Sequence, residues 1–233
     1  MIYGYEFDGI YQVDDFYTSA ATGKLILKPG ITNNTRYDGG AAPGVVKYKD
    51  QNGDGKITTA DRTVIGNAMP KWLGGITNSF SFKGIDFSFM LQYSYGNDVF
   101  NATRQFATGS QDQRYNMLAE VADRWSPTNA SNKVPSTKGY VKGDVYSRFV
   151  EAGSFLRLKN MTLGYSLPKK WINKIHISKL RIYGTAQNLF CISGYNGYDP
   201  EVSTAASNPM TPGLDWGAYP KSRVFTFGLD VQF

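Results

Sequence analysis

The chain has 233 residues, with 25 Lys and Arg against 19 Asp and Glu, which gives a formal net charge of +6. The cations are scattered and form no basic run, so a nucleic-acid partner is not indicated. One cysteine, Cys191, excludes an intrachain disulfide and a cysteine metal cluster. The one histidine, His176, lies in a stretch rich in Lys and Ile, where we expect a surface or turn residue and not a catalytic base.

Abundant aromatic residues, 15% of the chain, and 25 glycines favour an all-β protein. No apolar run approaches the roughly 18 residues of a membrane helix. The mean hydropathy of −0.36 is that of a soluble protein, but such averages miss β-barrels, because lipid-facing and lumen-facing residues cancel. The first ten residues lack the features of a signal peptide, which fits either a cytoplasmic protein or a chain that starts inside a longer one.

Residues 2–12 alternate with a period of two, which predicts a strand with Tyr3, Tyr5, Phe7 and Tyr11 on one face. Residues 13–70 are rich in Gly, Asn, Asp and Thr and predict a long, mostly irregular loop. Loops of this length are usually functional.

Two clearer strands follow, over residues 72–83 and 85–95, and a tight Lys83–Gly84 turn joins them. In the second strand, Ile85, Phe87 and the other odd-numbered residues to Tyr95 are apolar or aromatic, whereas most of the even-numbered residues are polar. Its eleven residues match the length of a tilted strand that crosses a bilayer, while strands of soluble proteins have about five or six.

Residues 97–150 form a second long polar segment, in which Tyr115 to Trp125 has helical spacing that we attribute to packing. The next strand, residues 155–167, alternates cleanly only in its second half. Arg157 and Lys159 occupy the apolar phase of the first half, so either they lie above the membrane or a bulge shifts the phase.

The last two predicted strands are residues 180–192 and 223–233, and a segment rich in Gly, Pro and Asp separates them. In the final strand, Phe225, Phe227, Leu229, Val231 and the terminal Phe233 face one way.

Six predicted strands are thus joined by connections that alternate between long and short, which is typical of an antiparallel transmembrane β-barrel with long extracellular loops and short periplasmic turns. A soluble sandwich would alternate as well, but would not need such long strands or an aromatic outer face. Six strands cannot close a barrel by themselves, since the smallest have eight. The chain is therefore either a C-terminal piece of a larger barrel or part of an oligomer that closes one.

Residues Asp50 to Asp61, DQNGDGKITTAD, have the ligand spacing of a twelve-residue calcium loop. Oxygen ligands are expected from Asp50, Asn52, Asp54, the carbonyl of Lys56, Thr58 and Asp61, with Gly55 at the sharp turn. The last position is Asp in place of the usual bidentate Glu. We expect a structural Ca²⁺ that orders the loop and does not act as a sensor; a turn without an ion is the alternative.

Eight stretches in order run along nearly the whole chain: YGYEFDGIYQ, PGVVKYKDQNGDGKITTADRTVIGNAMPKW, FSFKGIDFSFMLQYSYGNDVFN, DRWSP, FLRLKNMTLGYSLPKKW, RIYGTAQNLF, YNGYDPEV and YPKSRVFTFGLDVQF. Together and in this order they resemble the SusC/RagA family of TonB-dependent outer-membrane transporters.

The resemblance implies that residues 1–233 are the C-terminal part of a 22-stranded barrel, without the plug, the TonB box or the signal peptide. It also implies an outer-membrane location, contact with outer-membrane lipid, a SusD-like lipoprotein partner, energy from TonB, and import of oligosaccharides or peptides. Together with the alternating final strand, it favours Phe225, Phe227, Leu229, Val231 and Phe233 as the signal that the barrel-assembly machinery recognises, although an ordinary strand end is the alternative for Phe233. The alternative is a soluble calcium-stabilised β-rich binding module.

Four aromatic residues in the last loop, Tyr195, Tyr198, Trp216 and Tyr219, are expected to be exposed. They are candidates for stacking on a substrate or for contact with a lid, although loop packing would explain them as well. No carboxylate is paired with a base or a nucleophile at a meaningful spacing, and we therefore expect no enzymatic activity.

Overall fold

The structure, a computed structural model, describes residues 1–109, 115–172, 177–204 and 211–233, and the prediction for His176 lies outside them. The chain divides into two compact units. We call Met69–Asp98, Ala152–Val202 and Ala218–Phe233 the sheet unit, and Met1–Ala68, Val99–Glu151 and Ser203–Gly217 the loop unit. Each is described by itself.

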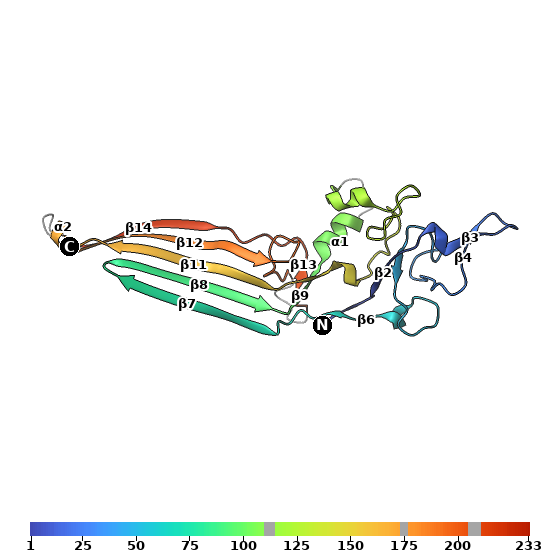
Figure 1. Ribbon diagram of the computed structural model, residues 1–233, viewed down its shortest axis with the longest axis horizontal. Helices are drawn as coiled ribbons and strands as arrows, with labels where there is room; N and C mark the ends of the chain where they lie inside the picture. The colour runs from blue at the N-terminus through green and yellow to red at the C-terminus, as the bar shows by residue number, and fades with distance from the viewer. Residues whose placement is uncertain (110–114, 173–176, 205–210) are drawn as a thin grey trace. The chain divides into compact units, whose positions relative to one another are not determined.

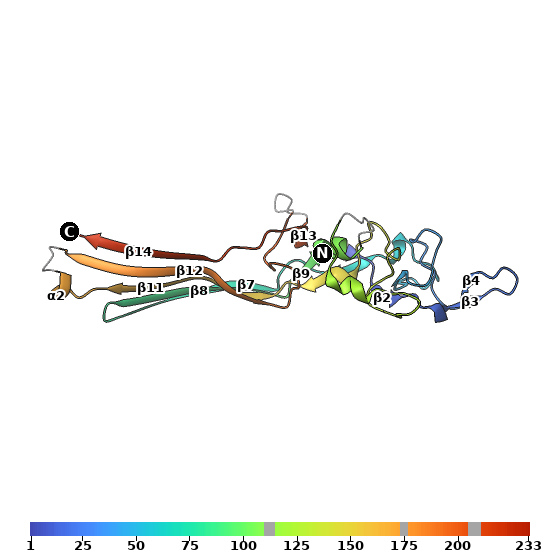
Figure 2. The ribbon, with the colours of Figure 1, turned by 90° about the horizontal axis from the view of Figure 1, so that it is seen from above.

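The sheet unit is built on five long antiparallel strands in the order β14-β12-β11-β8-β7 (Figure 1). Seen from above, they form one thin curved layer (Figure 2). The strands are β7 (Trp72–Phe82), β8 (Ile85–Tyr95), β11 (Phe155–Ser166), β12 (Lys179–Ser193) and β14 (Val224–Gln232). Each coincides with a predicted strand to within one residue at either end.

Short connections join the strands at one end of this sheet. Lys83 and Gly84 both have positive φ, 48° and 85°, which is the backbone of the type I′ turn that suits a two-residue hairpin. Helix α2 (Lys169–Ile172) lies in the connection from β11 to β12, and the C-terminus lies at the same end (Figure 1). The alternation of short and long connections is therefore confirmed for these five strands.

The predicted first strand of the barrel, residues 2–12, is wrong. These residues form two short strands, β1 (Ile2–Gly4) and β2 (Phe7–Ile10), in separate sheets of the loop unit. Gly9 has a φ of +106° and shifts the register against β5, so the alternation does not continue. Tyr5 and Tyr11 are buried and do not form an aromatic outer face. The long sheet consequently has five strands and not six.

The loop unit contains short elements in place of the irregular segments expected from the sequence. Three two-stranded sheets pair β1 with β6, β2 with β5, and β3 with β4, and a further sheet has the order β10-β9-β13. Their bounds are β3 (Phe16–Thr18), β4 (Leu25–Leu27), β5 (Val46–Tyr48), β6 (Thr63–Gly66), β9 (Asp98–Asn101), β10 (Val150–Ala152) and β13 (Leu214–Asp215). Short 3₁₀ turns span Val13–Asp15, Thr59–Asp61, Ala119–Asp123 and Ser147–Phe149.

The helix of the loop unit is α1 (Ala102–Gly109), earlier in the chain than the predicted helical stretch. In that stretch only Ala119–Asp123 turns, as a 3₁₀ helix. Val121 and Trp125 are buried and Tyr115 is exposed, so packing explains the buried part of the pattern. None of the described helices is both long and apolar enough to cross a membrane.

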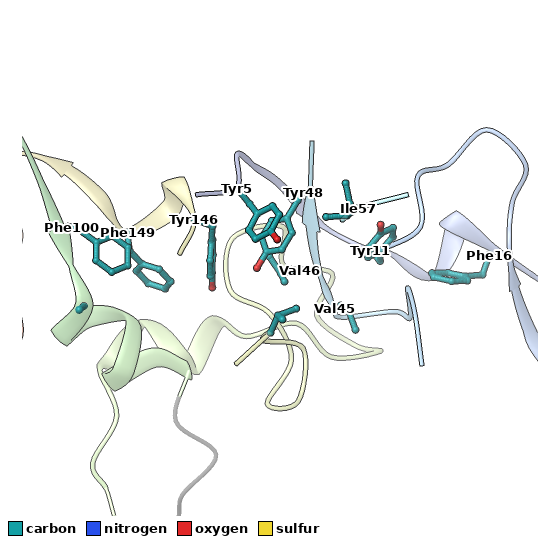
Figure 3. Packing of buried hydrophobic residues seen from close by; sticks show 12 residues of the cluster. Tyr5, Tyr11, Phe16, Val45, Val46, Tyr48, Ile57, Phe100, Tyr146 and Phe149 are labelled. Carbon is teal, nitrogen blue, oxygen red and sulfur yellow. The ribbon is translucent and has the colours of Figure 1, made fainter. Parts of the chain in front are cut away.

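An aromatic core holds the loop unit together (Figure 3). Tyr5 stacks on Tyr48 with ring centroids 4.8 Å apart, and Tyr146 contacts both Tyr48 and Phe149. Burial raises the pKa of the Tyr48 hydroxyl well above its ordinary value, because the phenolate would lose its hydration. The core joins residues near the N-terminus with residues beyond position 140, so segments far apart in sequence form one folded unit.

Candidate functional site

The sheet unit has one apolar and one polar face. The strand register aligns Phe80, Phe87, Leu163, Gly184 and Phe227 in one row across all five strands. Apolar side chains dominate the face that this row belongs to, and many are well exposed: Phe227 is 85% exposed. The exposed members are Trp72, Ile76, Phe80, Phe82, Ile85, Tyr95, Leu156, Leu163, Tyr165, Ile182, Phe190, Ile192, Phe225, Phe227, Leu229 and Val231. An apolar patch of this extent marks a surface that is covered by lipid or protein.

A bulge in β11 resolves the two alternatives for Arg157 and Lys159. The register shifts between Leu158 and Asn160 against both β8 and β12. Against β8 Lys159 is the extra residue, whereas against β12 the extra residue belongs to β12, between Gln187 and Phe190. The shift keeps Leu156 and Leu158 in the rows of the apolar face and moves Arg157 to the polar face opposite Gln92. The phase change is therefore an effect of the bulge.

Arg181 organises one end of the polar face. Its guanidinium is 2.6 Å from a carboxylate oxygen of Asp86 on β8 and 3.2 Å from one of Asp230 on β14. Gly164 of β11 lies between them, and a Cβ there would be 2.5 Å from Asp86. Glycine at that position therefore makes room for a charge network that crosses four strands.

A second charge cluster fastens the loop after β12 to the polar face. Arg157 is only 4% exposed and pairs with Asp199, and Glu201 accepts from Lys159 and Lys221 at 3.0 and 2.6 Å. Partial burial raises the pKa of the Glu201 carboxyl, but the two lysines outweigh it and hold that pKa below its ordinary value. The cluster orders this loop. Sequence spacing gives no sign of it, because the strand residues Arg157 and Lys159 are each 42 residues from their carboxylate partners.

The predicted assembly signal coincides with β14, a strand at the edge of the sheet. Phe225, Phe227, Leu229 and Val231 all lie on the apolar face and are exposed. Phe233 follows the last residue of the strand and is 92% exposed. Its recognition by assembly machinery stays a prediction.

The four candidate aromatic residues do not form one group. Tyr195 is buried, which contradicts its prediction as an exposed residue, whereas Tyr198 and Tyr219 are 76% and 89% exposed. Trp216 belongs to the loop unit, where its ring meets Phe106 edge-on at 5.7 Å between centroids. Sequence reasoning missed Phe106 and Tyr115, which complete a small exposed aromatic group with Trp216.

Backbone contacts hold this aromatic group in place. The Thr103 hydroxyl on α1 accepts a hydrogen bond from the Gly217 amide at 2.6 Å, and the Leu118 amide donates to the Ala107 carbonyl at 3.0 Å. Arg104 on the same helix pairs with Glu120 at 2.7 Å and with Glu151 at 2.9 Å. Three segments of the loop unit are thereby tied to α1.

The loop from Asp50 to Asp61 folds as a series of turns closed by its own acidic side chains. Asp50 accepts hydrogen bonds from the Gly53 and Gly55 amides, each at 2.7 Å, and Asp54 accepts from the Lys56 amide at 2.8 Å. Partial desolvation raises the pKa of Asp50, but the amide hydrogen bonds outweigh it and lower that pKa below its ordinary value. Gly53 and Gly55 both have positive φ, as such turns require.

Asp61 closes the end of the same loop and is fully buried. It accepts from the Gln51 and Thr58 amides at 3.0 and 2.7 Å, and the second bond completes a capping box at the Thr59–Asp61 turn, of which Asp61 is the last residue. Among the described residues no three His, Cys, Asp or Glu side chains come together as a group that could hold a metal ion. An ionised carboxylate has about four acceptor positions, so Asp50 and Asp54 keep free lone pairs, and the donor types fit Ca²⁺. Calcium binding stays a prediction.

Comparison with known proteins identifies the family. The chain is 34% identical over 236 residues to TonB-dependent receptor P3 of Formosa agariphila, which covers 99% of this chain and 22% of the relative. It is also 33% identical over 199 residues to TonB-dependent receptor SusC of Bacteroides thetaiotaomicron, which covers 84% of this chain and 18% of that protein. The chain is a SusC/RagA-type sequence. It spans about a fifth of the length of the curated relatives it matches.

A solved structure shares the fold of this SusC/RagA-type chain. The RagAB peptide importer in its open-open state matches with a TM-score of 0.70 at 21% identity, over 100% of this chain and 22% of that chain. No family model matches the sequence. The resemblance read from the sequence is therefore confirmed by its relatives.

Proposed function

We propose that the chain is the C-terminal barrel part of an outer-membrane, TonB-dependent nutrient importer. The observation that carries this proposal is the sheet with one continuous exposed apolar face and one polar face rich in ion pairs. A transmembrane barrel needs this division, because one face meets lipid and the other meets the lumen. A soluble binding module would bury such a face, so the alternative reading from the sequence has less support.

The free edges of the sheet support a larger barrel. β7 and β14 each pair with only one of the described strands. Unpaired backbone groups in lipid cost several kcal/mol each, so both edges need further strands. We propose that these belong to the 22-stranded barrel that the family resemblance implies, with the long connections outside the cell and the short ones in the periplasm.

The relatives' names support the transported class. SusC is named a TonB-dependent receptor, and RagAB is named a peptide importer. We propose that this chain serves the import of a glycan or a peptide together with a SusD-like lipoprotein and TonB, and that it has no enzymatic activity. The exposed Tyr198, Trp216 and Tyr219 are the candidates here for contact with a substrate or lid.

Fractionation of cells that produce the chain tests the assignment. The chain should sediment with outer membranes and stay dispersed only in detergent. Deletion of Phe233 should reduce membrane insertion, whereas Phe233→Tyr, which keeps an aromatic ring, should not. A chain that stays dispersed without detergent would contradict the proposal, and unchanged insertion after the deletion would remove Phe233 from the assembly signal.

We also propose that the Asp50–Asp61 loop binds a structural Ca²⁺ outside the cell. Asp54→Ala should lower the thermal stability only when calcium is present. Asp38→Ala, an exposed aspartate outside the loop, is the matched control and should have no calcium-dependent effect. Equal destabilisation by Asp54→Ala with and without calcium would refute calcium binding by this loop.

A further inference from the structure

A hollow of about 570 Å³ lies at the end of the sheet that carries the long connections. Its walls come from the sheet unit alone, and five of its lining residues belong to the rows of the apolar face: Trp72, Tyr93, Tyr95, Leu156 and Ile192. The volume is within the range of about 300–1,000 Å³ that is typical of small-molecule sites.

The Tyr93 ring lines the hollow and leans toward β7. A Cβ on Gly74, its partner on β7, would be 2.8 Å from the Tyr93 hydroxyl oxygen, so the tyrosine ring lies over that glycine. On its other side Tyr93 pairs with Leu156 of β11, which pairs in turn with Ile192 of β12. The space between the leaning ring and these two aliphatic side chains is left open.

The three serine hydroxyls of the lining are already hydrogen-bonded within the protein. The Ser94 hydroxyl donates to Asn97, the Ser193 hydroxyl donates to the Ser154 carbonyl, and the Ser154 hydroxyl accepts from the Gly96 amide, each at 2.9 Å. A sugar or a peptide would need hydrogen-bond partners from the walls. These walls offer mainly apolar surface, which fits a hydrocarbon chain.

A cation stands beside the hollow. Lys71 directly precedes Trp72 and is exposed, its amide donates to the Tyr95 carbonyl at 2.9 Å, and it has no ion-pair partner in the described part of the chain. Its methylenes lie against Gly96, where a Cβ would be 2.9 Å from them. Aromatic residues with a lysine are the usual composition of a barrel surface at the level of the lipid headgroups.

We propose that this hollow binds one acyl chain of an outer-leaflet lipid, with the lipid's anionic headgroup next to Lys71. The inference rests on the proposed function, which puts the apolar face in the membrane. The occupant follows from the continuity of the hollow with that face, from its internally hydrogen-bonded serine hydroxyls and from the adjacent cation. The site would hold a lipid for longer than the surrounding surface does, because protein side chains would contact the acyl chain on both of its sides.

The test uses the chain as the cell makes it, purified from the outer-membrane fraction and reconstituted in phosphatidylcholine vesicles. Spin-labelled phosphatidylglycerol reports the number of slowly exchanging lipids per chain. Ile192→Trp fills the hollow and should remove a single slow lipid. Ile182→Trp makes the same change on the same strand and face, outside the hollow, and should leave the number unchanged.

Two further variants make the result specific. Gly74→Val should push the Tyr93 ring into the hollow and reproduce the loss seen with Ile192→Trp. Lys71→Glu should weaken retention of labelled phosphatidylglycerol but not of labelled phosphatidylcholine. Equal numbers of slow lipids in wild type and Ile192→Trp would overturn the acyl-chain site, and no effect of Lys71→Glu would overturn the headgroup contact.

Flotation of the vesicles keeps this outcome apart from failure of the proposed function. If all variants float with the vesicles and have the same number of slowly exchanging lipids, only the lipid site is wrong. If wild type itself does not float, the membrane assignment is wrong and the lipid measurement does not apply to this chain.

Discussion

The two units of the chain place the same residue types in opposite environments. In the loop unit Tyr11 and Phe149 have no exposed surface, whereas in the sheet unit Phe227 and Phe80 are 85% and 57% exposed. Tyr11, Phe80 and Phe227 all come from alternating aromatic segments of the sequence. Alternation therefore identifies a strand with two different faces. The length of the strand and the strands next to it decide whether its apolar face meets a protein core or a membrane.

The largest expected effect breaks the core of the loop unit. Phe149→Ala should destabilise that unit by about 3–5 kcal/mol, because it removes a fully buried ring and leaves a cavity. Tyr219→Ala, at a residue that is 89% exposed, should change stability by less than about 0.5 kcal/mol. Chemical denaturation followed by near-UV circular dichroism measures both. Similar losses from the two variants would mean that the core is not packed as described.

The next effect tests the outward face of the sheet unit. Ile76→Arg, in the middle of β7, should destabilise the membrane-inserted state by about 2–4 kcal/mol, which is the cost of an arginine near the bilayer midplane. Thr77→Arg puts the same charge on the next residue, which faces the polar side, and should be tolerated. Folding titrations in phospholipid vesicles compare the two. A larger loss for Thr77→Arg would reverse the assignment of the faces.

The smallest effect contrasts the pH dependence of the two units. The pKa of Glu201 is lowered in the folded sheet unit, so its stabilisation is present above its ordinary pKa and is lost as the pH falls through the folded value. Burial outweighs Arg36 and raises the pKa of Asp144 in the loop unit, so ionisation there lowers stability as the pH rises. Glu201→Gln should therefore abolish a loss of stability that occurs as the pH falls. Asp144→Asn should abolish a gain of stability that occurs as the pH falls.

Local unfolding measured by hydrogen exchange between pH 3 and pH 7 separates these two contributions. Amides after β12 should respond to Glu201→Gln, and amides around Tyr146 should respond to Asp144→Asn. The same sign of change in both regions would contradict the opposite pKa directions.

The long strands were predictable because each carries its own evidence. The strand from Ile85 to Tyr95 alternates over its whole length, and its hairpin with β7 follows from the Lys83–Gly84 turn. Local pattern is enough when a strand is long and its two faces differ in chemistry.

The remaining features depend on contacts between distant residues. The bulge at Lys159 could be suspected but not decided, since the pairing of β11 with β8 and β12 defines it. Residues 2–12 were assigned to the wrong sheet because nothing local shows that Tyr5 stacks on Tyr48. The Arg157–Asp199 pair joins residues 42 apart, and no spacing rule predicts such a partner.

The central claim is that the apolar face of the five-stranded sheet lies against lipid. Cys191→Ser gives a background for a single spin label at position 227 or 226, which are neighbours on β14 with opposite orientations. In reconstituted vesicles, a label replacing Phe227 should relax strongly with oxygen, which concentrates in lipid, and weakly with a water-soluble nickel chelate. A label replacing Thr226 should show a much lower ratio of oxygen to nickel effects. A label at 227 that the nickel chelate reaches as readily as oxygen does would contradict the account.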